Sequence, residues 1–266
     1  MKVILSRKGF DLGNGDCASP ILPDGTLLSM PIPSFDNTSY QSLNIDIEGF
    51  GNKTYANVAR ELNPRRLFDL CHLDPDIRRD ACERPADWKP AFGQAYGSLT
   101  HLKNNDIKEG DLFLFFGWFR QTELFEGKLR FVKKAPSLHV IYGYLQIGEI
   151  INNPNEKSIP DWLKIHPHFT KKYSDNNAIF IARDNLTWDK SKEGAGCLTL
   201  DKKLVLTKEG HSRSHWDFPE EFKNISITNH SAKSWKSDYF KSVDIGQEFV
   251  FEECPIVEEW AKNIIG

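Results

Sequence analysis

Histidine and carboxylate side chains alternate in the segment HLDPDIR, which begins at His72. Pro75 disfavours helical geometry at the residue before it, so Asp74 is expected to be extended and to point the same way as His72. A carboxylate beside an imidazole orients the ring and raises its basicity, which suits acid–base chemistry and equally suits half of a metal site. We therefore predict His72 and Asp74 as catalytic residues, with Asp76 and Arg78 contacting the substrate. The alternative is structural, because an aspartate before proline commonly starts a turn or caps a helix.

The segment SRKGFD, residues 6–11, places two cations and a carboxylate in a glycine-containing loop after a short apolar run. The amides and cations of such a loop can bind a phosphate. We predict Ser6, Arg7 and Lys8 as substrate contacts and Asp11 as a third catalytic group. The alternative is a solvated loop in which Arg7 and Asp11 pair with each other or with neighbours.

Aromatic, cationic and amide side chains follow one another in the segment FGWFRQ, residues 116–121. These residue types stack on a nucleobase and form hydrogen bonds with its edge. We predict Trp118 and Arg120 as ligand contacts and include Gln94 in the predicted substrate-binding set. The competing interpretation is that these aromatic residues pack at the rim of the core.

Several familiar catalytic motifs are absent: the P-loop, the dinucleotide-binding fingerprint, the zinc-deaminase motif and the nucleophile elbow. The histidine pairs His166 and His168, and His211 and His215, have no acidic third ligand at a familiar spacing. The five cysteines are scattered, without a pair at zinc-ribbon or redox spacing, and are expected to be reduced thiols. We therefore predict no metal site, and the sequence identifies no cofactor.

The elements that would position these residues are mainly strands. Apolar runs at residues 112–116 and 178–182 are typical of buried strands. Residues 139–149 predict another strand, with glycines where a bulge is needed. We also expect a hairpin over residues 198–206 and a helix over residues 257–264. The patterns predict an α+β fold, with a β-rich curved sheet or partly open barrel flanked by short helices.

Length and charge suggest one domain, residues 1–266, with an N-terminal half over residues 1–105 and a sheet core over residues 106–266. The net charge of -3 argues against a broad basic surface for duplex DNA. The first residues lack the apolar core of a secretory signal. No apolar run reaches the roughly 18 residues that a membrane span requires. We expect a cytoplasmic protein without a membrane partner.

Three separated stretches carry a family resemblance: SRKGFD leading into CASPILPDGTLLSMPIP, then HLDPDIR, and finally GDLFLFFGWFR followed by LHVIYGYLQIGEI. In this order they resemble the nucleotide modification associated domain 3 family. The resemblance implies a role on nucleotides or nucleic acid in bacterial or phage modification or defence. The strings GDLFLFF and IYGY are also similar to the β-barrel core of PUA and ASCH domains, which surround a base pocket.

We therefore expect a protein that binds a nucleotide or modified base, in nucleic acid or free. One hypothesis is an enzyme acting at a glycosidic or exocyclic bond, with Asp11, His72 or Asp74 as acid and base. The other is a PUA-like reader without chemistry, in which Trp118 stacks on a flipped or single-stranded base. The imidazole and carboxylate cluster favours the enzyme, because a reader has no need of it. The sequence leaves the substrate, the reaction and the oligomeric state open.

Overall fold

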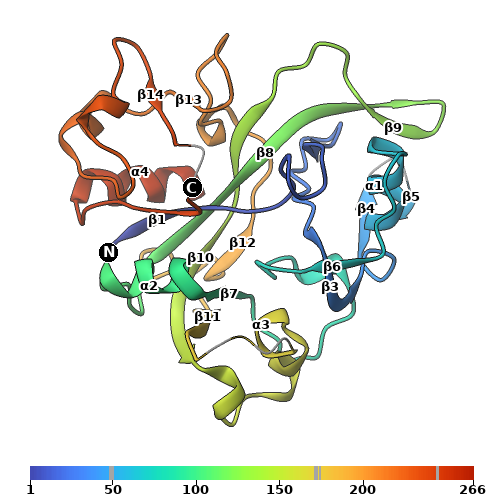
Figure 1. Cartoon of the computed structure of the whole chain (residues 1–266), viewed down its shortest axis with the longest axis horizontal. Helices are drawn as coiled ribbons and strands as arrows, with labels where there is room; N and C mark the ends of the chain where they lie inside the picture. The colour runs from blue at the N-terminus through green and yellow to red at the C-terminus, as the bar shows by residue number, and fades with distance from the viewer. Residues whose placement is uncertain (48–50, 171–172, 174, 244–245) are drawn as a thin grey trace.

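The computed structural model describes residues 1–47, 51–170, 173, 175–243 and 246–266, and it is built around one curled sheet (Figure 1). Along the main path of this sheet lie β15 (Glu248–Val250), β1 (Val3–Arg7), β8 (Leu112–Phe125), β10 (Leu138–Asn152), β11 (Asn177–Ala182) and β7 (Ala91–Ala95). Side branches are formed by β2 (Ser19–Ile21) and β9 (Lys128–Phe131), which pair with β8, and by β12 (Ala195–Cys197), which pairs with β10. The β-rich curved sheet is therefore confirmed.

Strand β8 lies at the centre of the sheet. It runs parallel to β1 on one side and antiparallel to β10 on the other. The first five residues of β8 are completely buried. An apolar side chain at each position is required here because elements cover both faces of the strand. The predicted central strand is confirmed.

Strand β10 bends at two bulges, as its glycines predicted. Its register shifts between Ile141 and Gly143 against β8, and between Ile147 and Glu149 against β11. A Cβ atom on Gly143 would lie 2.4 Å from a methyl carbon of Ile77, so this position has no room for a larger residue. The bulges let one long strand pair with β8 and then with β11 while the sheet curls.

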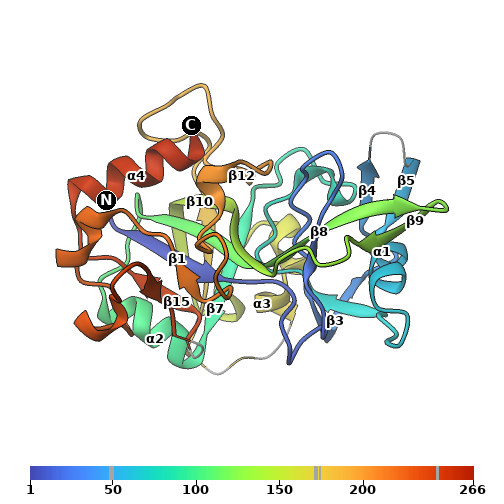
Figure 2. The same ribbon diagram turned by 90° about the horizontal axis from the view of Figure 1, so that it is seen from above.

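Smaller elements surround the sheet. Three further strand pairs are β3 (Ile32–Ser39) with β6 (Leu70–His72), β4 (Asn44–Ile47) with β5 (Gly51–Thr54), and β13 (His215–Trp216) with β14 (Phe240–Lys241). The α-helices are α1 (Tyr55–Leu62), α2 (Tyr96–Asn104), α3 (Pro167–Thr170) and α4 (Pro255–Ile265). Short 3-10 helices occupy Arg79–Ala81, Pro154–Glu156, Asp161–Ile165, Lys202–Leu204, Glu220–Asn224 and Ala232–Ser234. Figure 2 shows α4 and α2 on opposite sides of the strands. Within the described ranges, every helix is too short or too polar to cross a membrane.

Among the residues that the structure describes, the buried apolar side chains form three clusters. The largest fills the sheet around Phe113 and Phe116. A second joins Phe10, in the loop after β1, to the segment that contains α1. A third packs Trp162 against the outer strands β7 and β11. Segments from all three clusters border the site described below.

The predicted hairpin over residues 198–206 is wrong. Strand β12 ends at Cys197 and pairs with β10, and the following residues form the 3-10 helix Lys202–Leu204. Val205 then makes a bridge to Val140 of β10. The apolar residues in this stretch are therefore buried by a distant strand, whereas a hairpin would require a partner within the stretch itself.

Candidate functional site

A cleft of about 1020 Å³ lies beside strand β7. Its wall combines the loop after β1, the end of β6, the junction of β7 and α2, and side chains from β8 and α3. It therefore collects residues that are far apart in the sequence. Seven of the predicted site residues line it: Arg7, Lys8, Asp11, His72, Asp74, Gln94 and Trp118.

Asp74 is held against the edge of β7. Asp76 exchanges two backbone hydrogen bonds with Ala91, at 2.9 and 3.0 Å. Asp74 uses its side chain instead, because Oδ1 accepts a hydrogen bond from the amide of Gly93 at 2.7 Å. Only 4% of the Asp74 side chain is exposed. The position of Oδ1 is thus fixed, and Oδ2 faces the neighbouring imidazoles.

His72 is the last residue of strand β6, and a bulge in β3 places a carboxylate beside it. Pro33 and Thr38 of β3 pair with the same residue of β6, so the residues between them loop outward. In this bulge Asp36 places Oδ2 2.6 Å from Nδ1 of His72 and also accepts a hydrogen bond from the Ser34 hydroxyl at 2.8 Å. A carboxylate can only accept, so Nδ1 of His72 donates. In the neutral ring, Nε2 is then unprotonated.

The tautomer of His168, in α3, is set by Asn177 at the start of β11. The side-chain amide of Asn177 donates to the carbonyl oxygen of His168 at 2.6 Å, so its Oδ1 must accept from the ring. That oxygen lies 2.7 Å from Nδ1 of His168. The proton therefore sits on Nδ1, and Nε2 carries the lone pair. The ring also stacks on Tyr173, with centroids 4.5 Å apart.

Gly93 leaves the space that the His168 ring occupies. A Cβ atom at this position would lie 2.2 Å from Cδ2 of His168. The absence of a side chain therefore allows the imidazole to lie directly on the backbone of β7, beside the amide that binds Asp74.

Burial and the neighbouring side chains shift the pKa values of His168 and Asp74. Burial lowers the pKa of His168 to about 4, although the charge of Asp74 acts in the opposite direction. Burial alone would raise the pKa of Asp74, but the adjacent imidazoles of His166 and His168 hold it below its usual range. Nε2 of His166 lies 3.5 Å from Oδ1 of Asp74. At neutral pH the site therefore contains a carboxylate beside a neutral His168 ring.

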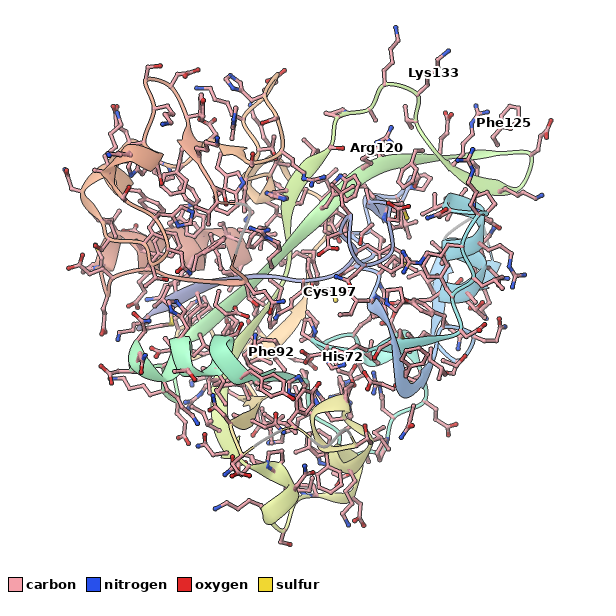
Figure 3. The ribbon with its side chains drawn as sticks, in the orientation of Figure 1. His72, Phe92, Arg120, Phe125, Lys133 and Cys197 are labelled. Carbon is pink, nitrogen blue, oxygen red and sulfur yellow. The ribbon has the colours of Figure 1, made fainter. Side chains whose placement is uncertain are left out.

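Three ligand-type atoms converge as a result. Oδ2 of Asp74 lies 3.8 Å from Nε2 of His72 and 3.9 Å from Nε2 of His168. All three atoms lie within 4.8 Å of one another. Such a set can transfer protons to and from a substrate or bind a divalent cation. Figure 3 marks the position of His72 among these elements.

Lys8 and Gln94 are joined through a buried carboxylate. Nζ of Lys8 and Nε2 of Gln94 lie 3.1 and 2.5 Å from the same oxygen of Glu248. The ammonium group of Lys8 also lies 4.5 Å from the centroid of the Phe92 ring. Both cleft residues are thereby held in fixed orientations, and Glu248 offsets the charge of Lys8.

A second cationic region of the cleft contains Arg7, Arg213 and Trp118. Arg7 donates to the carbonyl oxygen of Val243 at 2.7 Å. The Arg213 guanidinium lies 4.4 Å from the centroid of the Trp118 ring. Arg7, Arg213 and Trp118 give this part of the wall a positive and aromatic character, which suits a nucleotide.

Asp11 has a role within its own loop. One of its carboxylate oxygens accepts hydrogen bonds from the amides of Gly13 and Asn14, at 2.8 and 2.6 Å. Asp11 therefore fixes the loop that borders the cleft. Arg7 and Asp11 form no ion pair among the described contacts.

The structure places the other predicted substrate contacts outside the cleft. Ser6 is buried in β1, and Asp76 forms a buried bidentate ion pair with Arg84. Arg78 pairs with Asp80, with Nε and Oδ1 2.9 Å apart. These contacts suit structural roles.

Arg120 also lies away from the cluster. Its guanidinium packs over the Phe131 ring, 4.9 Å from the centroid. Figure 3 shows it well separated from His72. Trp118 lines the cleft, whereas Arg120 packs against Phe131 of β9.

Sequence reasoning missed several residues that complete the site. The expectation of no metal site rested on the lack of an acidic partner near His166 and His168, but the fold supplies Asp74 from a distant segment. Asp36, Gly93 and Asn177 had no local signal, because each acts through a contact between elements that are far apart in the sequence.

Comparison with known proteins agrees with the resemblance seen in the sequence. No curated protein and no solved structure gives a match. The family model described as nucleotide modification associated domain 3 matches residues 2–252, which is nearly the whole chain. The chain therefore belongs to the nucleotide modification associated domain 3 family.

Proposed function

We propose that this protein binds a nucleotide, or a base presented by nucleic acid, in the cleft beside β7 and acts chemically on its glycosidic or exocyclic bond. The observation that carries the proposal is the composition of this single cleft. It joins the cationic and aromatic wall around Arg7, Arg213 and Trp118 to the imidazole and carboxylate cluster of His72, Asp74 and His168. Its volume lies at the upper end of the range for small-molecule sites.

The cluster supports catalysis over simple recognition. Keeping an ionised carboxylate in a buried position is costly unless its surroundings compensate. Here the amide of Gly93 and several imidazoles surround Asp74. Groups with perturbed pKa values in a cleft are typical of catalytic sites. A neutral His168 with an unprotonated Nε2 offers a lone pair that can accept a hydrogen bond or hold a ligand.

Product analysis tests the proposal directly. Purified protein is incubated with nucleoside mono- and triphosphates and with DNA and RNA, with and without divalent metal, and the products are measured by mass spectrometry. We expect a product from the wild type and from His211→Ala, whose side chain does not line the cleft. The variants His72→Ala, Asp74→Asn and His168→Ala should lose it while retaining the circular dichroism spectrum of the wild type.

Binding measurements separate the enzyme from a reader. Stacking on an aromatic side chain contributes about 1–3 kcal/mol per base, so Trp118→Ala should weaken nucleotide binding about 5- to 150-fold. Binding that depends on Trp118 without any product would replace the catalytic part of the proposal with a reader. The absence of both binding and product would overturn it.

A further inference from the structure

We infer that His72, Asp74 and His168 form a binding site for one divalent transition-metal ion, with Nε2 of each histidine and Oδ2 of Asp74 as ligands. The separations of 3.8 and 3.9 Å between the carboxylate oxygen and the two ring nitrogens are slightly wider than those around a bound ion. Tetrahedral ligand bonds of about 2.0–2.2 Å place ligand atoms roughly 3.3–3.6 Å apart, so these two separations would close by a few tenths of an ångström. The ligand atoms lie within 4.8 Å of one another, so the two imidazoles would move together by up to about an ångström.

Each of the three ligand residues is oriented by a contact at its other polar atom. Asp36 holds Nδ1 of His72, Asn177 holds Nδ1 of His168, and the amide of Gly93 holds Oδ1 of Asp74. Metal-binding histidines almost always donate their second N–H to a carboxylate or carbonyl group in this way. The second polar atoms of these residues are Nε2 of His72, Nε2 of His168 and Oδ2 of Asp74, and these three atoms converge. General acid–base catalysis alone would not require three converging atoms.

The ligand types indicate the class of ion. Two imidazoles and one carboxylate suit zinc, iron and their neighbours, whereas calcium and magnesium prefer sites made entirely of oxygen. A three-residue set leaves coordination positions open to water or substrate, as in catalytic metal sites. Because the three ligand residues line the cleft, we place the open positions towards it.

The test is a titration of the whole 266-residue chain, treated with chelator, with Zn²⁺ in the absence of nucleotide. Binding is measured by isothermal titration calorimetry. We expect one equivalent to bind with micromolar or tighter affinity. His72→Ala and His168→Ala should each weaken binding at least about 100-fold, and His211→Ala should bind as the wild type does. The two variants change ligands on separate elements, so misfolding of one of them would not explain a loss of binding in both. Thermal melting of the metal-free proteins shows whether each variant is folded.

Variants of the orienting residues provide a second readout. Asp36→Asn and Asn177→Leu leave all three ligands in place but should weaken Zn²⁺ binding about 10- to 100-fold. Substitution of Co²⁺ reports the ligand set through its visible absorption, which should change in His168→Ala. Wild-type protein that binds no Zn²⁺, or ligand variants that bind it as tightly as the wild type, would overturn the inference. Nucleotide binding and product formation are measured separately. The inferred metal site can therefore be overturned while the proposed function is upheld, and the proposed function can be overturned while the metal site is upheld.

Discussion

At the scale of single residues, the site depends on side chains whose two polar ends have different partners. His72, Asp74 and His168 each use one atom to bind the scaffold and present the other to the cleft. The place of these residues beside the cleft therefore does not by itself decide which of their atoms face it. The partner on the far side of each ring or carboxylate decides which atom is available.

His139 is a buried residue of the cleft wall with consequences for acid stability. Its Nδ1 accepts a hydrogen bond from the indole N–H of Trp216 at 3.0 Å. Burial, reinforced by the charges of Arg7 and Arg213, lowers its pKa from 6.5 to about 3. Between these pH values only the unfolded chain binds the proton, so the stability that His139 provides above pH 6.5 is lost as the pH falls.

We predict that His139→Asn removes part of this acid sensitivity, because Oδ1 of asparagine can replace Nδ1 as the acceptor without titrating. From pH 7 to pH 5 the free energy of unfolding of the wild type should fall by about 2 kcal/mol more than that of the variant. Urea unfolding at the two pH values measures the difference. Equal losses in the two proteins would show that His139 takes up a proton in the folded state.

At the scale of elements, the helices that surround the sheet are individually short. Helix α1 is an example, since it has only eight residues and depends on its cap. The hydroxyl of Thr54 accepts from the amide of Asn57 at 3.2 Å, and the side chain of Asn57 accepts from the amide of Thr54 at 3.1 Å. Isolated helices of this length are not stable in water.

Thr54→Ala should therefore lower the free energy of unfolding by about 1 kcal/mol, because it removes the acceptor of the Asn57 amide at the helix start. Thr54→Ser retains the hydroxyl and serves as the matched control. Chemical denaturation of both variants gives the comparison. If the alanine variant is as stable as the serine variant, the cap contributes nothing and packing alone holds α1.

The elements also show what a sequence can predict. Buried strands were recognisable in β8, β10 and β11 because an uninterrupted apolar run requires cover on both faces. The bulges of β10 were predictable from glycines. The hairpin at residues 198–206 was wrong because the same apolar pattern is satisfied by pairing with β10. Asp36 contacts His72 because β3 has a bulge. No local sequence pattern marks where an eight-residue strand will bulge outward.

At the scale of the whole molecule, the cleft lies where separate apolar clusters meet. Phe113 belongs to the cluster inside the sheet and contacts the rings of Phe92 and Phe180. Phe68 belongs to the cluster around α1 and stacks on Phe10 with centroids 5.3 Å apart. Regions with separate cores often open separately in native proteins.

Hydrogen exchange should reveal this division. Phe68→Ala should increase amide exchange in α1 and leave β8 unchanged, whereas Phe113→Leu should lower protection throughout the chain by about 1–3 kcal/mol. Mass spectrometry of exchanged peptides measures both regions in one experiment. A uniform loss of protection in Phe68→Ala would instead mean that the clusters unfold as one cooperative unit.

The contact between Asp74 and β7 has a further consequence, for solubility. Strand β7 ends the main path of the sheet, and the outer strand of a sheet can pair with a strand of another chain. Asp76 covers its backbone at Ala91, and the carboxylate of Asp74 covers the next outward amide at Gly93. The carboxylate that faces the cleft therefore also occupies an outward amide of the edge strand, and replacing it by an apolar residue should leave that amide open to pairing with another chain.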